Sequence, residues 1–164
     1  MQVLDTDLIN GITDGRRIGV TRGALRFFAS DDELGWVVAH EIAHNILQHA
    51  EDAKFQTMLH RLLSAWGAGS DSSEAMPPGP SLEVQADYVG AYLMARAGYD
   101  LDAVRRVWTR LARIELRQIR DGPSLADTHP PTKERLAAFE LTRQEIEAKR
   151  RTGEPLSVQF EGGT

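Results

Sequence analysis

Two histidines four residues apart, with a glutamate between them, lie in the segment VVAHEIAHNILQH, residues 37–49. On a helix, His40 and His44 would share one face about 6 Å apart along the axis, so both imidazoles could reach one Zn²⁺. Glu41 would be turned about 100° from His40. In that position its carboxylate is poorly placed to bind the ion, but it can reach a water bound to the ion. The pattern therefore predicts two metal ligands and a general base.

A catalytic zinc site needs a third protein ligand, because such sites hold three and leave one position for water. A metzincin arrangement is excluded, since Leu47 and Ala50 stand where that pattern requires glycine and histidine. A cysteine ligand is excluded because the chain has no cysteine. The segment SLEVQAD offers a glutamate and an aspartate on one helical face. We expect Glu83 to be the third ligand, and Asp87 to accept a hydrogen bond from the outer nitrogen of a ligand histidine.

Two helices must position these groups. Ser30 and Glu33 have the spacing of a capping box, so the first helix is expected to begin near Asp31. It should run at least to His49, with its furthest end near Ala65. Four apolar residues recur at every fourth position and form one stripe along it: Leu34, Val38, Ile42 and Ile46.

The second helix is expected from about Leu82 to Ala97, with Gly98 as its stop. Gly90 lies inside this helix, where glycine costs about 1 kcal/mol relative to alanine. Stripes of small residues on both helices would permit the close approach that a shared metal requires. They comprise Gly35, Ala39 and Ala43 on the first helix, and Ala86, Gly90 and Met94 on the second.

The remaining segments predict an α+β fold, because strands come first and helices follow. Strands are expected at residues 2–4 and 17–21, with an Asp-Gly hairpin turn before the second. Further helices are expected at about 23–28, at 101–120, and from Pro131 to just before Gly153. We therefore expect a mostly helical core with a small N-terminal antiparallel β-sheet. Two segments are expected to lie outside the regular elements: a mobile Gly/Ser/Pro-rich loop at 67–80 and a tail at 154–164.

Composition narrows the class of protein. The chain has 164 residues and a net charge of −5, which fits a single domain over residues 1–164 and gives no reason to expect a nucleic-acid partner. No apolar run approaches the roughly 20 residues of a membrane span. The first residues, MQVLDTDLING, lack the features of a signal peptide. Neither a transmembrane nor a targeting segment is therefore expected within this chain.

Taken together, several motifs resemble one known family. They are Asn10, IGVTRGAL (18–25), DELGWVVAHEIAH (32–44), EVQAD (83–87), ARAGYD (95–100) and THPPTKER (128–135). Their order is similar to that of the zinc metallopeptidase family of HtpX and the CAAX prenyl proteases, over residues 8–150. The resemblance is closer to the soluble bacterial members of the cell envelope, which implies an envelope or periplasmic location.

The resemblance also implies a fold and a set of roles. It implies a gluzincin-like endopeptidase core with one Zn²⁺ per chain, held by His40, His44 and Glu83, and with Glu41 as base. It further implies that the strand around residues 18–21 is the sheet edge along which the substrate backbone lies.

His129 precedes two prolines in DTHPPTKER. Because residues before proline favour extended backbone, His129 could simply lead into the last helix. The resemblance implies instead that the His-Pro loop borders the active site. There His129 would either stabilise an oxyanion or occupy the fourth zinc position. Arg135 would either hold this loop by a salt bridge or be a solvated helix residue.

We therefore expect a zinc-dependent endopeptidase that hydrolyses internal peptide bonds of extended or unfolded proteins. Zinc-bound water would be the nucleophile and Glu41 the general base. The alternative is a latent or chaperone-like binding module whose zinc is capped by His129. A purely structural zinc is disfavoured, because such sites have four protein ligands and no use for Glu41. The expected partner is a protein or peptide substrate, and no pattern specifies an oligomeric state.

Overall fold

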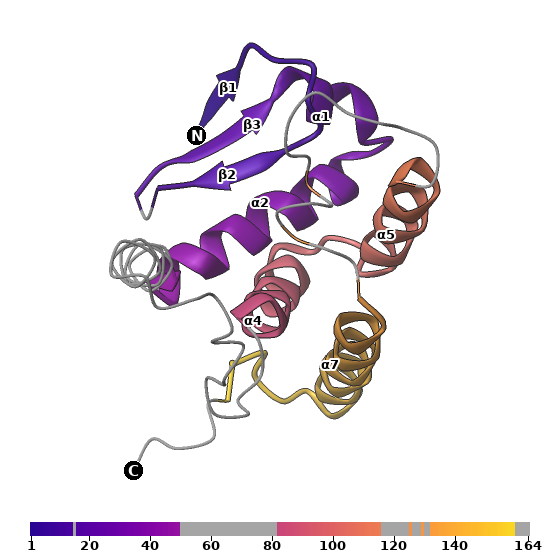
Figure 1. Cartoon of the computed structure of the whole chain (residues 1–164). Coiled ribbons are helices and arrows are strands. Elements are labelled where there is room, and N and C mark those ends of the chain that lie inside the picture. Colours follow the sequence, from indigo (N-terminus) through magenta and orange to yellow (C-terminus); the bar gives the residue numbers. More distant parts are fainter. Residues whose placement is uncertain (15, 50–81, 116–124, 126–128, 130–131, 160–164) are drawn as a thin grey trace, which may run out of the picture.

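The computed structural model describes residues 1–14, 16–49, 82–115, 125, 129 and 132–159, without the side chains of residues 114 and 115. In Figure 1, α2 lies between the N-terminal sheet and α4. The expected mobile loop at 67–80, the extension of the first helix toward Ala65 and the end of the third helix after residue 115 lie outside the described residues.

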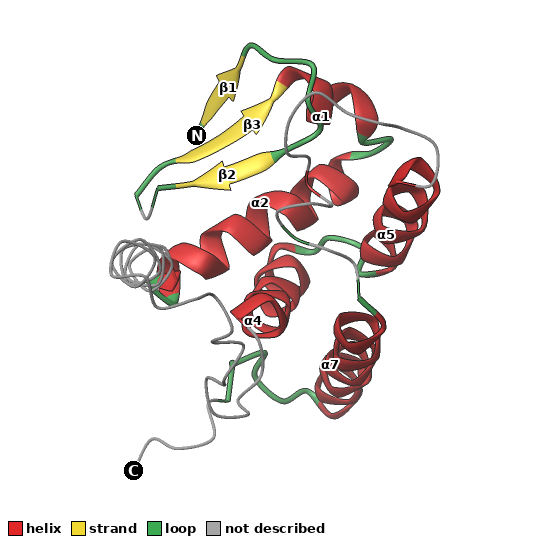
Figure 2. Cartoon of the chain, in the orientation of Figure 1, coloured by secondary structure: helices red, strands yellow, loops and turns green. Residues whose placement is uncertain are grey.

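The sheet has three strands in the order β1-β3-β2, as Figure 2 shows: β1 is Gln2–Leu4, β2 is Gly11–Thr13 and β3 is Ile18–Thr21. The α+β class is confirmed. However, β1 pairs with β3 in parallel and β2 pairs with it antiparallel, so the expected all-antiparallel sheet is wrong in one pair. The hairpin signal indicates only the β2–β3 pair.

The connection between β1 and β2 explains the parallel pair. It passes the end of β3, where the backbone N–H of Thr21 donates to Asn10 O at 3.1 Å. The backbone N–H of Asn10 in turn donates to Thr21 Oγ1 at 3.0 Å. These two bonds hold the connection beside Thr21, so β1 and β2 lie on opposite sides of β3.

The helix α2 spans Asp31–Ile46 and follows the short helix α1 at Arg22–Phe27. Its start agrees with the capping-box prediction. Ser30 Oγ accepts the N–H of Glu33 at 3.3 Å, and Glu33 Oε2 accepts the N–H of Ala29 at 2.8 Å. Its end does not agree, since the expected continuation to His49 is wrong. The backbone of Gln48 has φ 59°, which an α-helix cannot contain.

Three further helices follow, on the side of α2 away from the sheet (Figure 1). α4 spans Leu82–Ala97 as predicted and stops before Gly98, whose φ is 83°. α5 spans Asp102–Glu115. α7 spans Lys133–Thr152, begins two residues later than expected with Thr132 as N-cap, and ends at Gly153 with φ 74°. None of the described helices is long and apolar enough to cross a membrane.

At Gly90, α4 packs closely against the backbone of α2. A Cβ built on Gly90 would lie 3.3 Å from the backbone nitrogen of His40 and 3.4 Å from the carbonyl carbon of Ala39. Ala43 and Ala86, both fully buried, pack together nearby. The close approach expected from the small residues is therefore present. The main core beside it is aromatic and aliphatic, and its members include Trp36, Tyr92, Met94, Trp108 and Phe139.

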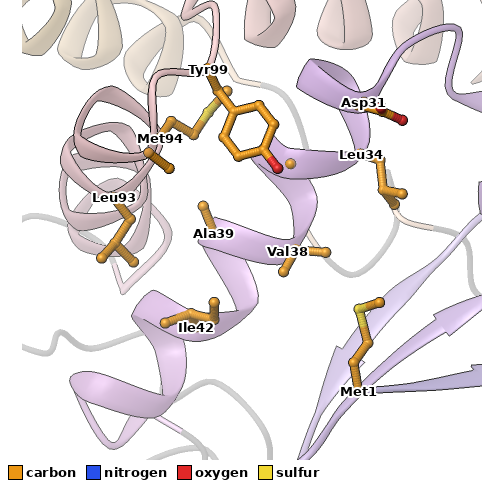
Figure 3. Close-up of a pocket in the computed structure, with 11 residues that line it drawn as sticks. Met1, Asp31, Leu34, Val38, Ala39, Ile42, Leu93, Met94 and Tyr99 are labelled. Atoms are coloured by element: carbon orange, nitrogen blue, oxygen red, sulfur yellow. The ribbon is translucent and has the colours of Figure 1, made fainter.

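The apolar stripe of α2 is not its buried face. Ile46 is 56% exposed, and Leu34, Val38 and Ile42 are only half-buried. Figure 3 shows Leu34, Val38 and Ile42 of this stripe, which line a hollow of about 440 Å³ together with Leu93 and Met1. The opposite face of α2 is the more deeply buried one, although it carries two histidines and a glutamate.

Candidate metal centre

α2 aims the two histidines of the HExxH motif at one point. His40 and His44 lie one turn apart on its buried face, and their Nε2 atoms are 3.0 Å apart. α4 supplies the carboxylate of Glu83. Its Oε2 lies 3.3 Å from His40 Nε2, and its Oε1 lies 3.4 Å from His44 Nε2. Three potential ligands from two helices therefore converge, as expected for a shared ion.

The spacing of these atoms fits a small tetrahedral ion. Zinc binds nitrogen and carboxylate oxygen at about 2.0–2.1 Å, which gives a tetrahedron with edges of about 3.3 Å. The three separations of 3.0, 3.3 and 3.4 Å bracket that length. The donor set of two imidazoles and one carboxylate is also one that catalytic zinc sites use. The residues present therefore fit Zn²⁺.

A fourth potential ligand comes from outside the two helices. His129 Nδ1 lies 2.9 Å from Glu83 Oε2 and 3.3 Å from His40 Nε2. With His44, these residues form a group whose ligand atoms all lie within 4.8 Å of one another. The His129 backbone N–H donates to Leu125 O at 2.8 Å, and the Leu125 N–H donates to Ile9 O at 2.7 Å. The N-terminal segment thus fixes the position of His129.

Glu41 lies beside this cluster but is not one of the residues that form it. Its side chain is 1% exposed, and its Oε1 accepts no hydrogen bond from the described residues. His129 lies across from that oxygen, with its Nε2 3.5 Å away. A buried carboxylate oxygen normally has a hydrogen-bond partner. Glu41 Oε1 therefore lies next to the cluster with its capacity to accept a hydrogen bond unused by the described residues.

A buried ion pair lies behind His40. Its outer nitrogen, Nδ1, is 3.0 Å from Asp87 Oδ1. Arg135 donates to both oxygens of Asp87, and its Nη1 is 3.1 Å from Glu83 Oε2. The Arg135 guanidinium also lies over the Trp108 ring, 5.2 Å from its centroid. The solvated alternative for Arg135 is wrong, since its side chain is 2% exposed.

These contacts set the charge of each group. Burial opposes the ionised form of Asp87, but Arg135 and His40 outweigh it and hold the pKa of Asp87 below its usual value. Burial likewise favours neutral His40, yet the carboxylates of Asp87 and Glu83 raise the pKa of His40 to about 9. Burial would raise the pKa of Glu83, and the surrounding histidines lower it instead. In the absence of metal, a proton therefore occupies the cluster, and a metal ion would have to displace it.

The family follows from comparison with known proteins. The model of Peptidase family M48 matches residues 9–77 and 75–143, which is most of the chain. This chain belongs to peptidase family M48. The metallopeptidase family expected from the motifs is thereby confirmed.

Three curated relatives carry the name mitochondrial metalloendopeptidase OMA1. The Schizosaccharomyces pombe protein is 29% identical over 87% of this chain and 46% of its own length. The Saccharomyces cerevisiae protein is 27% identical over 76% of this chain and 40% of its own length. The Arabidopsis thaliana protein is 30% identical over 73% of this chain and 26% of its own length. The chain thus spans less than half the length of these relatives. Their names give no support to the expected periplasmic location.

One expectation about the M48 site is wrong. Residues 18–21 are not an edge of the sheet, because β3 is paired on both sides. Among the described strands, the edge beside α2 is β2. A Cβ on Gly11 would lie 2.6 Å from Val37 Cγ1 and 3.7 Å from Glu41 Oε1, so β2 runs directly past the HExxH helix. The order of the strands decides which strand is the edge, and the residue pattern within each strand does not encode that order.

Two contacts of the M48 site were not expected from the sequence. One is the pairing of Arg135 with Asp87, which lies 48 positions earlier in the chain. The other is the approach of His49 to His44, with their Nδ1 atoms 3.0 Å apart. The sequence signal for Arg135 was its place in the THPPTKER motif. The signal for His49 was its place five residues after a ligand, but a continuous helix would have turned it away.

Proposed function

We propose that this M48 chain is the core of a zinc-dependent endopeptidase that cleaves internal peptide bonds of extended or unfolded proteins. The observation that carries the proposal is the convergence of His40, His44 and Glu83 at tetrahedral spacing, with the buried carboxylate of Glu41 next to them. This arrangement provides a metal site and an adjacent base, and a purely structural zinc has no use for the base.

The roles follow from the chemistry of the groups. A zinc ion held by the three ligands supplies Lewis acidity, which activates water and polarises a carbonyl group. Glu41 accepts the proton of the attacking water and delivers it to the departing amine. Asp87, fixed by Arg135 and 3.0 Å from His40 Nδ1, would accept the Nδ1–H of the metal-bound His40 and so keep the Nε2 lone pair directed at the ion.

The extended form of the substrate is supported by β2. This edge strand lies against α2 beside Val37 and Glu41. An extended backbone can add to such an edge through main-chain hydrogen bonds, which select a conformation and not a sequence. A peptide bond held along β2 would pass close to Glu41. Most of the backbone of a folded protein is already paired within its own helices and sheets, so an extended or unfolded segment suits this edge best.

A second candidate function rests on His129. Its Nδ1 lies at hydrogen-bond distance from Glu83 and 3.3 Å from His40 Nε2, which is the spacing of a fourth ligand. If His129 caps the ion, the chain is a latent enzyme or a chaperone-like binding module until the imidazole leaves. A cell-envelope location for either function stays a prediction of the sequence resemblance.

Elemental analysis together with a protease assay tests the proposal. Protein purified without added metal should contain one zinc per chain and should cleave an unfolded casein substrate. A chelator should abolish the cleavage, and added zinc should restore it. Glu83→Ala should lose most of the zinc, whereas Glu147→Ala, on the exposed side of α7, should keep it. Full zinc retention by Glu83→Ala would remove Glu83 from the ligand set.

A further inference from the structure

The outer nitrogen of the second ligand histidine has a partner of its own. His44 Nδ1 lies 3.0 Å from His49 Nδ1, and the two rings meet edge to face with centroids 5.0 Å apart. His49 is 4% exposed. His40 has an ionised carboxylate, Asp87, in the equivalent place. The outer nitrogen of each proposed ligand histidine therefore faces a different kind of group: a carboxylate for His40 and an imidazole for His44.

A specific turn of the backbone brings His49 to this position. α2 ends at Ile46, and Gln48 adopts the left-handed conformation with φ 59°. If the helix continued, residues five apart would be rotated by about 140° from each other and could not face one another. Left-handed backbone is uncommon for residues other than glycine and is a reason to look for a function. Here it folds the chain back, so that His49 meets the ring of His44.

The position of the protons follows from metal binding. A metal ion on His44 Nε2 uses that nitrogen's lone pair, so the proton of the neutral imidazole must be on Nδ1. The Nδ1–H of His44 then donates to whatever lies 3.0 Å away, which is Nδ1 of His49. His49 can accept only through an unprotonated Nδ1, and its own proton is then on Nε2.

We propose that His49 is a positioning residue of the metal centre, which accepts the Nδ1–H of His44 and so orients the second ligand imidazole. The inference rests on the metal site of the proposed function. It assigns a role to the last histidine of HExxHxxxxH and explains the left-handed turn before it. An uncharged acceptor at this place orients His44 without adding a further negative charge to a site that already holds Glu83 and Asp87.

Zinc affinity, measured by competition with a chromogenic chelator, tests the role. His49→Phe keeps an aromatic ring but removes the acceptor, and should weaken zinc binding about 10–100-fold, the range for loss of such a partner. His49→Asn places an oxygen near the position of Nδ1 and should restore most of that loss. Gln48→Gly, which keeps the left-handed turn and alters an exposed side chain, is the matched control and should bind zinc as the wild type does.

Thermal unfolding separates positioning from mere packing. His49→Phe should unfold near the wild-type temperature without metal and should gain less stability from zinc. Wild-type zinc affinity in His49→Phe would overturn the role, as would a loss that His49→Asn does not restore. If the wild type itself binds no zinc, the proposed function fails and not this inference alone.

The wild-type protein provides a test that does not depend on a variant folding. In the zinc-loaded protein, ¹⁵N–¹H correlation spectra of the imidazoles should show His44 protonated at Nδ1 and His49 protonated at Nε2. A proton on Nδ1 of His49 would overturn the inference, because that nitrogen could not then accept.

Discussion

Arg135 holds both oxygens of Asp87, with Nε 2.7 Å from Oδ2 and Nη2 2.8 Å from Oδ1. Both side chains are 2% exposed. Through Asp87 this pair reaches the outer nitrogen of His40, and through Nη1 it also reaches Glu83. A residue of α7 thus fixes groups on α2 and α4, and the geometry of the metal centre depends on all three helices.

Removal of Arg135 should therefore affect stability and metal binding together. Arg135→Met would leave the buried charge of Asp87 uncompensated, and breaking such a pair costs about 3–5 kcal/mol. Urea unfolding in the presence of a chelator should show this loss, and zinc affinity should fall about 10–100-fold. Arg143→Met is the control, because Arg143 forms more exposed pairs with Glu140 and Glu147. A loss no larger than that of the control would contradict the structural role of Arg135.

Glu41→Gln should separate catalysis from metal binding. Glutamine keeps the shape of the side chain but cannot take the proton of the attacking water. Zinc content and unfolding temperature should stay close to the wild type, while cleavage of an unfolded substrate should fall about 10²–10⁴-fold. The exposed Glu134→Gln should leave the rate unchanged. Turnover by Glu41→Gln within a few-fold of the wild type would show that Glu41 is not the general base.

His129→Ala distinguishes a cap from an oxyanion stabiliser. Since Nδ1 of His129 already lies within the ligand cluster, we expect the variant to cleave faster than the wild type in the absence of any activator. An oxyanion donor would give the opposite sign, with a loss of about 2.7–4 kcal/mol in transition-state stabilisation. Initial rates at equal zinc content decide the sign. An unchanged rate would mean that His129 has no role in the reaction and simply leads the chain into α7.

The pairing of Glu33 with Arg110 should make stability depend on acid pH. Hydrogen bonding to Arg110 outweighs burial and lowers the pKa of Glu33 below its usual 4.5. A depressed folded-state pKa contributes stability that is full above about pH 4.5 and is lost as the pH falls through the folded value.

Urea unfolding with a chelator present should therefore show Glu33→Gln less stable than the wild type at pH 7. The gap should narrow at pH 3. The chelator keeps metal release out of the comparison, and Glu134→Gln serves as the exposed control. A gap that stays constant between the two pH values would show that the carboxylate charge of Glu33 contributes nothing.

Local patterns were enough to predict much of the candidate site. The i, i+4 spacing of His40 and His44 and the capping box before them depend on one helix, and the start of α2 was predicted correctly. Glu83 followed from counting ligands, and its closeness to the histidines followed from small residues such as Gly90. Their roles as ligands stay predictions, although the structure brings their atoms together.

Other features depend on contacts that no periodicity encodes. The parallel pairing of β1 arises from the path of the connection past Thr21, which alternation within a strand does not show. The end of α2 depends on the left-handed backbone of Gln48, and glutamine is not a residue type that predicts this conformation. The sequence leaves open whether Arg135 forms a salt bridge or is a solvated helix residue, because its partner lies 48 positions earlier in the chain.

The missing side chain at Gly90 has a consequence for which ion the protein can hold. Since Gly90 lets α4 rest on the backbone of His40, it sets the distance between Glu83 and the histidines. Ca²⁺ binds oxygen at about 2.3–2.6 Å and takes six to eight ligands, so it would need these groups further apart and more of them. A bulkier residue at position 90 would widen the gap and relax that restriction. The ion selectivity of the proposed metal site would therefore depend partly on how tightly two helices pack.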